Sequence, residues 1–326
     1  MAPRDGGPPV ALPLAAAHGR CHAGAPLCVR FNATAHYLVT GGKDRAVRLW
    51  NHRKEDADGN AALVHEYAGA HGYEVRAVAP SPDSTRIASA GSDRALFVWD
   101  VRRGVVVRRL RGHEGGPVNA VRFAGASGAV LVTGGYDQTC RLWDNRSSDP
   151  RPVQVLTGFR DAVTCVADAA GRDAEAIVAG AADGSVRRFD VRSGGVVVDR
   201  FAADDGHAVA IADVALGVGG EVYLASCLDG HARLVDAAGG DVLATYVGHV
   251  CGGATKLECA LTRADAHAVL ASEDGRVLVY ELVDATAKHV GGTAGMPCVS
   301  SLDYAPSTGA VAAARVDGTL SVYTIV

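Results

Sequence analysis

LVTGGKDRAVRLWN at residues 38–51 recurs, with changes, as IASAGSDRALFVWD at residues 87–100 and as LVTGGYDQTCRLWD at residues 131–144. Each copy carries an aspartate six residues before a tryptophan, and the aspartate recurs beyond the third copy. Its seven occurrences, separated by 49, 44, 46, 46, 45 and 43 residues, are Asp44, Asp93, Asp137, Asp183, Asp229, Asp274 and Asp317. Repeats of this length are typical of four-stranded blades arranged in a ring. We therefore predict an all-β fold, a seven-bladed β-propeller.

Regular positions within each repeat indicate where its strands lie. An apolar residue, aromatic in all but one repeat, stands six residues after each aspartate; the seven are Trp50, Trp99, Trp143, Phe189, Val235, Tyr280 and Tyr323. Leu320-Ser321-Val322-Tyr323 alternates in polarity, as expected of a half-buried strand. The predicted blades cover residues 20–67, 68–111, 112–156, 157–201, 206–246, 248–284 and 298–326.

The two ends of the chain are predicted to meet. The last repeat, from Cys298 to Val326, has room for three strands, so we expect Val10 to Leu14 to supply the fourth, adding residues 10–15 to the last blade. A closed ring hides the strand edges that an open array exposes. The alternative, that the apolar stretch Val10 to Ala17 is the core of a signal peptide, would open the ring on cleavage, so we favour the strand. We predict one domain over residues 10–326 and a disordered tail over residues 1–9.

Composition narrows the function classes. The chain has 326 residues, a net charge of −4 and a pI of about 6.3, without the basic excess that phosphate binding favours. We therefore expect no direct sequence-specific binding of nucleic acid. The eight cysteines include no Cys-x-x-Cys pair, which in a chain of this length indicates buried thiols in a reducing compartment. No apolar run approaches the roughly 18 residues of a membrane span, so we expect no membrane partner.

Several positions of the repeat resemble the WD-repeat family. Gly112-His113 resembles its Gly-His start, and Trp99-Asp100 and Trp143-Asp144 resemble its Trp-Asp end. In that family a hydroxyl on the second strand, the turn aspartate, a loop histidine and the tryptophan of the third strand form a hydrogen-bonded tetrad, which gives a buried carboxylate the donors it needs. The resemblance implies three structural tetrads: His22, Thr40, Asp44 and Trp50; His71, Ser89, Asp93 and Trp99; and His113, Thr133, Asp137 and Trp143. Repeats four to seven keep the aspartate but lose other members, so blades one to three are expected to be the most regular.

No pattern in the sequence points to catalysis. A hydroxyl, a histidine and an aspartate recur together three times at matched spacing, whereas a catalytic triad is needed once, so we interpret them as structural. Gly217-Val218-Gly219-Gly220 lacks the third glycine of a dinucleotide-binding loop. The ligand types His18, Cys21, His22 and Cys28 match no common zinc spacing. We therefore predict that the protein is not an enzyme and holds no metal and no cofactor.

The surface of the ring offers a better candidate site. In a propeller, the loops between blades and the turns between second and third strands gather around the central channel on one face, which we call the top face. The residue before each repeat aspartate should lie there: Lys43, Ser92, Tyr136, Ala182, Leu228, Glu273 and Val316. Tyrosine and arginine are enriched among binding hot spots. The predicted protein-binding residues of the top-face loops are Lys43, Tyr73, Glu74, Tyr136, Arg160, Lys256 and Glu273.

Longer matches resemble one subfamily, the MAP-kinase organiser, a WD-repeat scaffold also associated with spliceosomes. They include His71-Gly72-Tyr73-Glu74-Val75, Asp183-Gly184-Ser185-Val186-Arg187-Arg188-Phe189-Asp190 and Lys256-Leu257-Glu258-Cys259. The resemblance implies a non-catalytic scaffold for MAP-kinase signalling, pre-mRNA splicing or both, with kinase-module or spliceosomal proteins as partners. It also implies a cytoplasmic and nuclear location and a monomeric ring within larger complexes. A rigid ring suits assembly because its loops are already positioned and several blades can hold different partners.

A second class of function remains open. Trp99-Asp100-Val101-Arg102 resembles the box through which some propellers dock onto the adaptor of cullin-4 ubiquitin ligases. Trp143-Asp144-Asn145-Arg146 is a looser version, because Asn145 replaces the usual aliphatic residue. The resemblance implies a ligase substrate receptor in which Trp99, Asp100 and Arg102 contact the adaptor. The ordinary alternative is that each arginine lies in a solvated turn between third and fourth strands.

Overall fold

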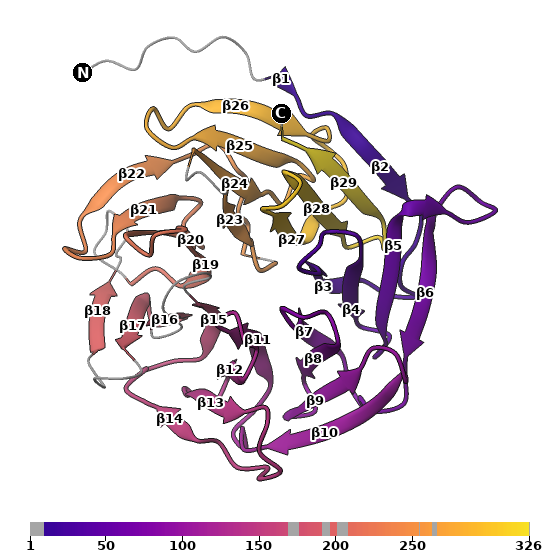
Figure 1. The fold of residues 1–326 in the computed structure, drawn as a ribbon. Coiled ribbons are helices and arrows are strands. Elements are labelled where there is room, and N and C mark those ends of the chain that lie inside the picture. Colours follow the sequence, from indigo (N-terminus) through magenta and orange to yellow (C-terminus); the bar gives the residue numbers. More distant parts are fainter. Residues whose placement is uncertain are drawn as a thin grey trace.

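The computed structural model describes residues 10–168, 176–190, 196–200, 208–253, 255–262 and 266–325. In these residues seven sheets are arranged in a ring, with the innermost strands around the centre (Figure 1). Each sheet is a blade of four antiparallel strands, apart from a fifth strand added to blade six. The prediction of a seven-bladed β-propeller is confirmed. The predicted disordered tail at residues 1–9 lies outside the described residues.

Strands follow one another outwards within each blade, and the chain then enters the centre of the next blade. The first three blades are β3 (Pro26–Phe31), β4 (Leu38–Gly42), β5 (Val47–Glu55) and β6 (Ala61–Tyr67); β7 (Val75–Pro80), β8 (Arg86–Gly91), β9 (Ala95–Asp100) and β10 (Val105–Arg111); and β11 (Val118–Ala124), β12 (Val130–Gly135), β13 (Cys140–Asp144) and β14 (Gln154–Leu156). Blades four and five are β15 (Val163–Asp168), β16 (Ala176–Ala181), β17 (Ser185–Asp190) and β18 (Val196–Arg200); and β19 (Ile211–Leu216), β20 (Val222–Cys227), β21 (Ala232–Asp236) and β22 (Val242–Tyr246). Blades six and seven contain β23 (Cys259–Leu261), β24 (His267–Ala271), β25 (Val277–Glu281) and β26 (Ala287–Gly291); and β27 (Val299–Ala305), β28 (Ala310–Arg315) and β29 (Leu320–Thr324).

The turn at the repeat aspartate has the same backbone shape in every blade. The residue after the aspartate has a positive φ, between 60° and 97°, in all seven: Arg45, Arg94, Gln138, Gly184, Gly230, Gly275 and Gly318. Glycine adopts this conformation without strain, which explains its use in blades four to seven. In six blades the carboxylate also accepts the N–H of the second residue after it. The aspartate therefore folds its own turn, whatever else the blade has lost.

The hydrophobic core lies between the blades. Seven clusters of buried side chains occur in the described residues, and each joins two neighbouring blades. Trp143 of blade three, for example, shares a cluster with Leu96 and Leu110 of blade two. The interface between blades seven and one is rich in small residues, namely Ala305, Ala310, Ala312 and Ala314. Because each sheet covers its neighbours, every blade needs a closed ring to bury both of its faces.

The N-terminal segment closes the ring, but its register differs from the prediction. The strand that completes blade seven is β2 (Leu14–His18), which pairs antiparallel with β29, and not Val10 to Leu14. The residues before it form β1 (Val10–Ala11), which adds a parallel fifth strand to blade six through β26. Pro13, which has no N–H to donate to a ladder, lies between the two strands, and its carbonyl accepts the N–H of Thr324. One short segment thus fastens blade six and blade seven together.

Blade six also extends further than predicted. Blade six was predicted to cover residues 248–284, yet β26 (Ala287–Gly291), which lies beyond that range, is its fourth strand. Its residues Ala287 to Val290 are only half-buried, because a rim strand faces solvent on one side. A half-exposed strand with mixed polarity carries a weak sequence signal, which explains the error.

Candidate functional site

The four side chains of each tetrad meet inside blades one to three. In blade one, His22 Nδ1 lies 2.7 Å from Asp44 Oδ1 and His22 Nε2 lies 2.8 Å from Thr40 Oγ1, while Trp50 Nε1 donates to Thr40 Oγ1 at 2.9 Å. The same three contacts, at 2.7–2.9 Å, join the residues of the other two sets: His71, Ser89, Asp93 and Trp99; and His113, Thr133, Asp137 and Trp143.

The direction of these bonds follows from the donors available. Indole N–H can only donate, so Thr40 Oγ1 accepts from Trp50; a neutral His22 that donates from Nδ1 to Asp44 has its Nε2 free to accept the hydroxyl hydrogen of Thr40. His22 Nδ1 then carries the hydrogen that Asp44 accepts. Burial lowers the pKa of His22, which favours this neutral ring. Burial raises the pKa of Asp44, but hydrogen bonds from Arg48 and His22 outweigh it and bring the value to about 2. The tetrad of blade one is therefore a satisfied structural chain, whereas in blade two Asp93 Oδ1 has no hydrogen-bond partner among the described residues.

Blades four and six show what replaces a tetrad. In blade four, Phe159 stands in place of the histidine and packs against Phe189, while Asp183 accepts the N–H of Arg160 and the N–H of Ser185. In blade six, His249 is kept but the hydroxyl position is occupied by Leu270, and neither ring nitrogen of His249 has a hydrogen-bond partner among the described residues. Burial lowers the pKa of His249, so it stays neutral.

The residue before each repeat aspartate is fixed at the top face by one backbone bond. In every blade its N–H donates to a carbonyl of the loop that precedes the blade, at 2.8–3.1 Å; the donors are Lys43, Ser92, Tyr136, Ala182, Leu228, Glu273 and Val316. The residue that supplies the accepting carbonyl lies directly before the first strand in every blade except the sixth. In blade six the acceptor is Val250, inside a longer loop. These seven positions are therefore held rigidly around the channel.

A hollow of about 570 Å³ lies at the top-face mouth of the channel. Three of the predicted binding residues line it, Lys43, Glu74 and Lys256, together with Leu228 and Val316 of the pre-aspartate series. Two others, Tyr73 and Tyr136, do not line it and are 65% and 58% exposed. Arg160 is also exposed and outside the hollow. The structure thus places charged residues in the mouth and aromatic residues on the surrounding face.

Two of the predicted acidic residues are engaged within the protein. Glu273 Oε2 accepts the N–H of Gly252 at 2.7 Å and its Oε1 accepts that of Thr255 at 3.2 Å, so its carboxylate holds the long loop of blade six. Glu74 accepts hydrogen bonds from Arg76 and Ser92. Both carboxylates shape the face, and a partner would meet them already hydrogen-bonded.

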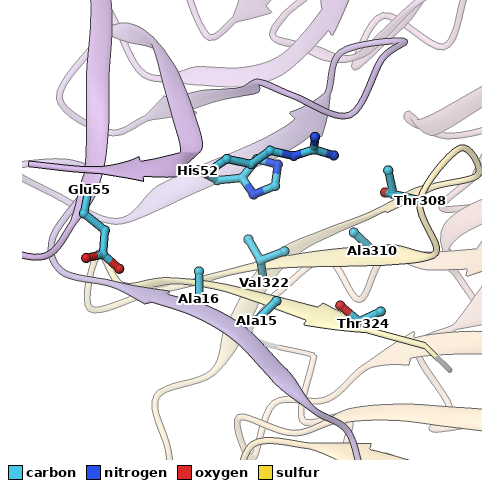
Figure 2. Close-up of a pocket in the computed structure, with 9 residues that line it drawn as sticks. Ala15, Ala16, His52, Glu55, Thr308, Ala310, Val322 and Thr324 are labelled. Carbon is cyan, nitrogen blue, oxygen red and sulfur yellow. The ribbon is translucent and has the colours of Figure 1, made fainter.

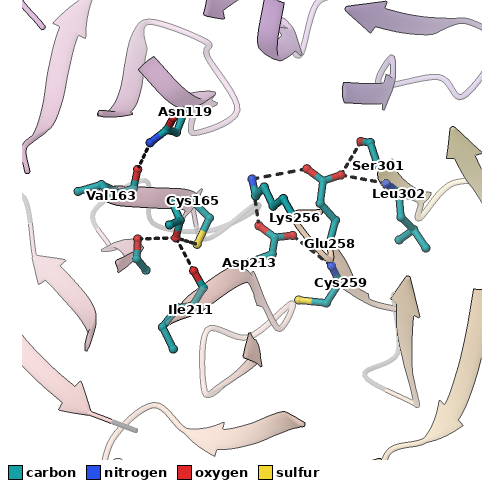
Figure 3. Close-up of polar contacts among 12 residues, drawn as sticks. Asn119, Val163, Cys165, Ile211, Asp213, Lys256, Glu258, Cys259, Ser301 and Leu302 are labelled. Carbon is teal, nitrogen blue, oxygen red and sulfur yellow. Dashed lines mark hydrogen bonds and ion pairs between the residues drawn. The ribbon is translucent and has the colours of Figure 1, made fainter. Parts of the chain in front are cut away.

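Lys256 lies inside the channel, in a network that the sequence did not reveal (Figure 3). Its Nζ is 3.8 Å from Asp213 Oδ1 and 3.6 Å from Glu258 Oε1. Glu258 in turn forms a two-pronged ion pair with Arg30 of blade one, at 2.7 and 2.9 Å. Ser301 Oγ and the N–H of Leu302, both in blade seven, donate to the same carboxylate. Blades six, seven and one are therefore joined at their centres.

A second cavity and the remaining sequence motifs give weaker indications of a functional site. A cavity of about 470 Å³ at the junction of blades seven and one is lined by Ala16, His52, Glu55, Val322 and their neighbours (Figure 2). His52 there donates its ring N–H to the carbonyl of Ala35, a structural role. Among the described residues, no cluster of three or more His, Cys, Asp or Glu side chains is placed to hold a metal ion. That part of the chain also has no helix long and apolar enough to cross a membrane.

The predicted ligase box is split between core and surface. Trp99 is buried in its tetrad, and Asp100 accepts the backbone N–H groups of Arg102 and Arg103 at 3.0 and 2.9 Å. Arg102 is exposed at the end of the blade opposite the top face. Of the three box residues Trp99, Asp100 and Arg102, the exposed one is Arg102.

Comparison with known families gives one match. Residues 17–51, 62–100, 104–144 and 150–190 match the family described as WD domain, G-beta repeat. These stretches fall in blades one to four, which include the three blades with full tetrads. Blade four is among the matched stretches although Phe159 and Ala179 replace its tetrad histidine and hydroxyl.

Comparison with curated proteins gives partial matches to several relatives. The chain is 25% identical over 145 residues to the WD repeat domain-containing protein 83 homolog of Dictyostelium discoideum, covering 44% of this chain and 42% of that protein. It is 33% identical over 182 residues to the Ribosome biogenesis protein WDR12 homolog of Chlamydomonas reinhardtii, covering 47% and 40%. It is 30% identical over 128 residues to the Pre-mRNA-splicing factor cwf17 of Schizosaccharomyces pombe, covering 39% and 36%. The matches span less than half the length of each relative.

Proposed function

We propose that the protein is a non-catalytic scaffold that assembles multiprotein complexes, from the premise that four stretches of this seven-bladed ring match the family described as WD domain, G-beta repeat. The observation that carries the proposal is the rigid top face, on which seven equivalent positions are pinned by backbone bonds around the channel mouth. Pre-positioned loops lower the entropy that partners lose on binding.

The setting we propose is pre-mRNA splicing, MAP-kinase signalling, or both. A relative whose name is Pre-mRNA-splicing factor cwf17 supports the first. The sequence resemblance to the MAP-kinase organiser, including Lys256-Leu257-Glu258-Cys259, supports the second. The proposed partners are spliceosomal or kinase-module proteins, met by a single ring in the nucleus and the cytoplasm. Affinity purification from the native cell followed by mass spectrometry tests the setting, because recovery of neither group would overturn it.

The exposed residues of the top face provide the first prediction. Tyr136→Ala combined with Arg160→Ala is expected to reduce recovery of the bound proteins about tenfold or more, because exposed Tyr and Arg often dominate binding energy. Neither side chain packs in the core, so the free energy of unfolding should change by no more than about 0.5 kcal/mol. Quantitative pull-down and chemical denaturation measure the two effects.

Asp137→Ala is the control for this experiment. It removes the partner of His113 and of Arg141, so it should lower the free energy of unfolding by about 2 kcal/mol or more. If the surface variant unfolds the protein while Asp137→Ala leaves it stable, the assignment of structural and binding residues is reversed.

A cullin-4 substrate receptor is the alternative function, and the exposure of Arg102 at the end opposite the top face favours it. Under this alternative the cullin-4 adaptor co-purifies with the protein, and Arg102→Ala removes it. Arg103→Ala is the matched control, since Arg103 is an equally charged and exposed neighbour outside the box. Adaptor recovery that survives Arg102→Ala, or no adaptor at all, ends this alternative.

A further inference from the structure

A groove with four arginines lies between blades two and three, away from the top face. It has a volume of about 450 Å³, and its lining includes Arg86, Val107, Arg108, Arg109, Asn145 and Arg146. Arg86 begins β8 and Asn145 follows the end of β13, so the groove opens at the end of the blades opposite the repeat turns. Among the described residues that line it, none carries a carboxylate.

The two innermost arginines are held by neutral oxygens. Arg108 donates to the carbonyls of Asp144 and Asp149 at 2.6 and 2.8 Å. Arg86 donates to the carbonyl and to the side-chain oxygen of Asn145 at 3.4 and 3.2 Å. Burial lowers the pKa of Arg108, as does the neighbouring charge of Arg86, while Asp144 raises it. The two guanidinium groups are therefore oriented, and their positive charge is not cancelled by a direct ion pair with a carboxylate.

The nearby carboxylates are already used. Asp144 accepts the backbone N–H of Arg146 at 2.8 Å and closes its own turn, and Asp149 is paired with Arg151 at 2.8 Å. Arg146 reaches Asp144 only at 3.3 Å and is 77% exposed. Arg109 lies over the ring of Phe97, 5.3 Å from its centroid, and projects from the rim. Arg86, Arg108 and Arg146 are thus the cations that face the groove, whereas the guanidinium of Arg109 lies against Phe97, which packs toward blade one.

The donor set suits a phosphate monoester. Guanidinium groups bind phosphate oxygens through paired, charge-assisted hydrogen bonds, and a phosphate group presents nearly two negative charges to them. Ser147 and Ser148 in the lining add neutral donors, whereas Asn145 already donates to the carbonyl of Gly128 and accepts from Arg86.

The surroundings favour a polypeptide over RNA as the carrier of the phosphate. Beside the groove, β10 is the rim strand of blade two, and no strand of the described residues pairs with its outer edge. Its residues Val105, Val106 and Val107 are 47%, 37% and 41% exposed, so an extended segment could pair with this edge and cover them. No aromatic side chain lines the groove in the described residues, which removes the stacking surface that single-stranded RNA uses. The net charge of −4 also disfavours a nucleic-acid track.

We infer that this groove binds a protein segment that carries a phosphorylated serine or threonine, with the phosphate between Arg86, Arg108 and Arg146 and the chain along the edge of β10. The inference rests on the proposed scaffold function in that the phosphate arrives on a partner protein. It adds a second, phosphorylation-dependent contact on the face opposite the channel mouth.

Fluorescence anisotropy with the full chain tests the inference. The probe is a labelled degenerate peptide pool with one fixed phosphoserine, compared with the same pool carrying serine and with a short oligouridylate. We expect the phosphorylated pool to bind at least about tenfold more tightly than the serine pool and to weaken as salt rises. Arg108→Gln and Arg146→Gln should each reduce that affinity, by about tenfold for the oriented Arg108 and by about threefold for the exposed Arg146.

Arg53→Gln is the matched control, because it removes the same charge from an exposed position in blade one. Equal binding of the two peptide pools, stronger binding of oligouridylate, or an equal loss in Arg53→Gln would each overturn the inference. Arg146→Gln keeps the test valid if Arg108→Gln fails to fold, since Arg146 is largely exposed. Recovery of native partners by these variants, measured in parallel, reports separately on the top-face function.

Discussion

Glu258→Ala is expected to lower the free energy of unfolding by about 3–5 kcal/mol, the usual cost of removing one partner from a buried ion pair. Glu258 is 3% exposed and receives hydrogen bonds from Arg30, Ser301 and the N–H of Leu302. Burial raises the pKa of Glu258, but the charge of Arg30 outweighs it and lowers the pKa, so the carboxylate is ionised. Without it the Arg30 guanidinium is left buried and unpaired, and the contact between blades one and six is lost. Chemical denaturation followed by tryptophan fluorescence measures the change.

Two further variants test whether the loss of stability in Glu258→Ala comes from breaking a buried ion pair. Glu66 pairs with Arg48 at 2.8 Å in blade one, but it is 43% exposed, so Glu66→Ala should cost no more than about 1 kcal/mol. The double variant Arg30→Met with Glu258→Leu should recover part of the stability, because a hydrophobic pair of similar volume avoids the desolvation of two charges, while the N–H of Leu302 still loses its acceptor. If Glu66→Ala is as damaging as Glu258→Ala, burial is not what makes the central pair important.

Leu12→Ala is expected to lower the free energy of unfolding by about 2–5 kcal/mol, as is usual for a buried leucine. Leu12 is 6% exposed and lies in the cluster between blades six and seven, and its N–H donates to the carbonyl of Val290. It joins β1 to β2, so its side chain anchors the segment that closes the ring. Loosening that segment also exposes the edges of β26 and β29, and the variant should therefore aggregate at lower temperature. Thermal unfolding with light scattering measures both effects.

Val10→Ala is the control for this variant. Val10 belongs to the same short segment but is 63% exposed, so its truncation should change stability by no more than about 0.5 kcal/mol. An equal effect at the two positions would mean that the segment is held by its backbone pairing alone.

The features that the sequence made visible are those contained within a single blade. His113, Thr133, Asp137 and Trp143 lie within 31 residues, and each is placed by the strand period and by the turn that Asp137 folds. A local pattern repeated seven times can be read from the sequence, because each copy supports the alignment of the others. The pre-aspartate positions of the top face followed from the same alignment.

The features that the sequence did not reveal depend on neighbouring blades. Lys256 was expected in a surface loop, yet its ammonium group turns into the channel toward Asp213 and Glu258. Glu273 was expected to meet a partner, yet its carboxylate holds the loop of Gly252 and Thr255. The direction of a long side chain cannot be predicted from loop length and strand pattern, because it depends on charged groups that lie on other elements.

By itself the sequence determined that this protein is a ring of seven equivalent blades, because the strand period and the turn aspartate are local properties that survive the loss of other residues. Only the tertiary structure decided how the ring is fastened and where its charges gather. Arg30 and Glu258 are 228 residues apart and meet only because closure brings blade one beside blades seven and six. The arginine groove likewise forms only where the rim of blade two meets the end of blade three. Such contacts arise from packing between blades, which no repeat within the sequence encodes.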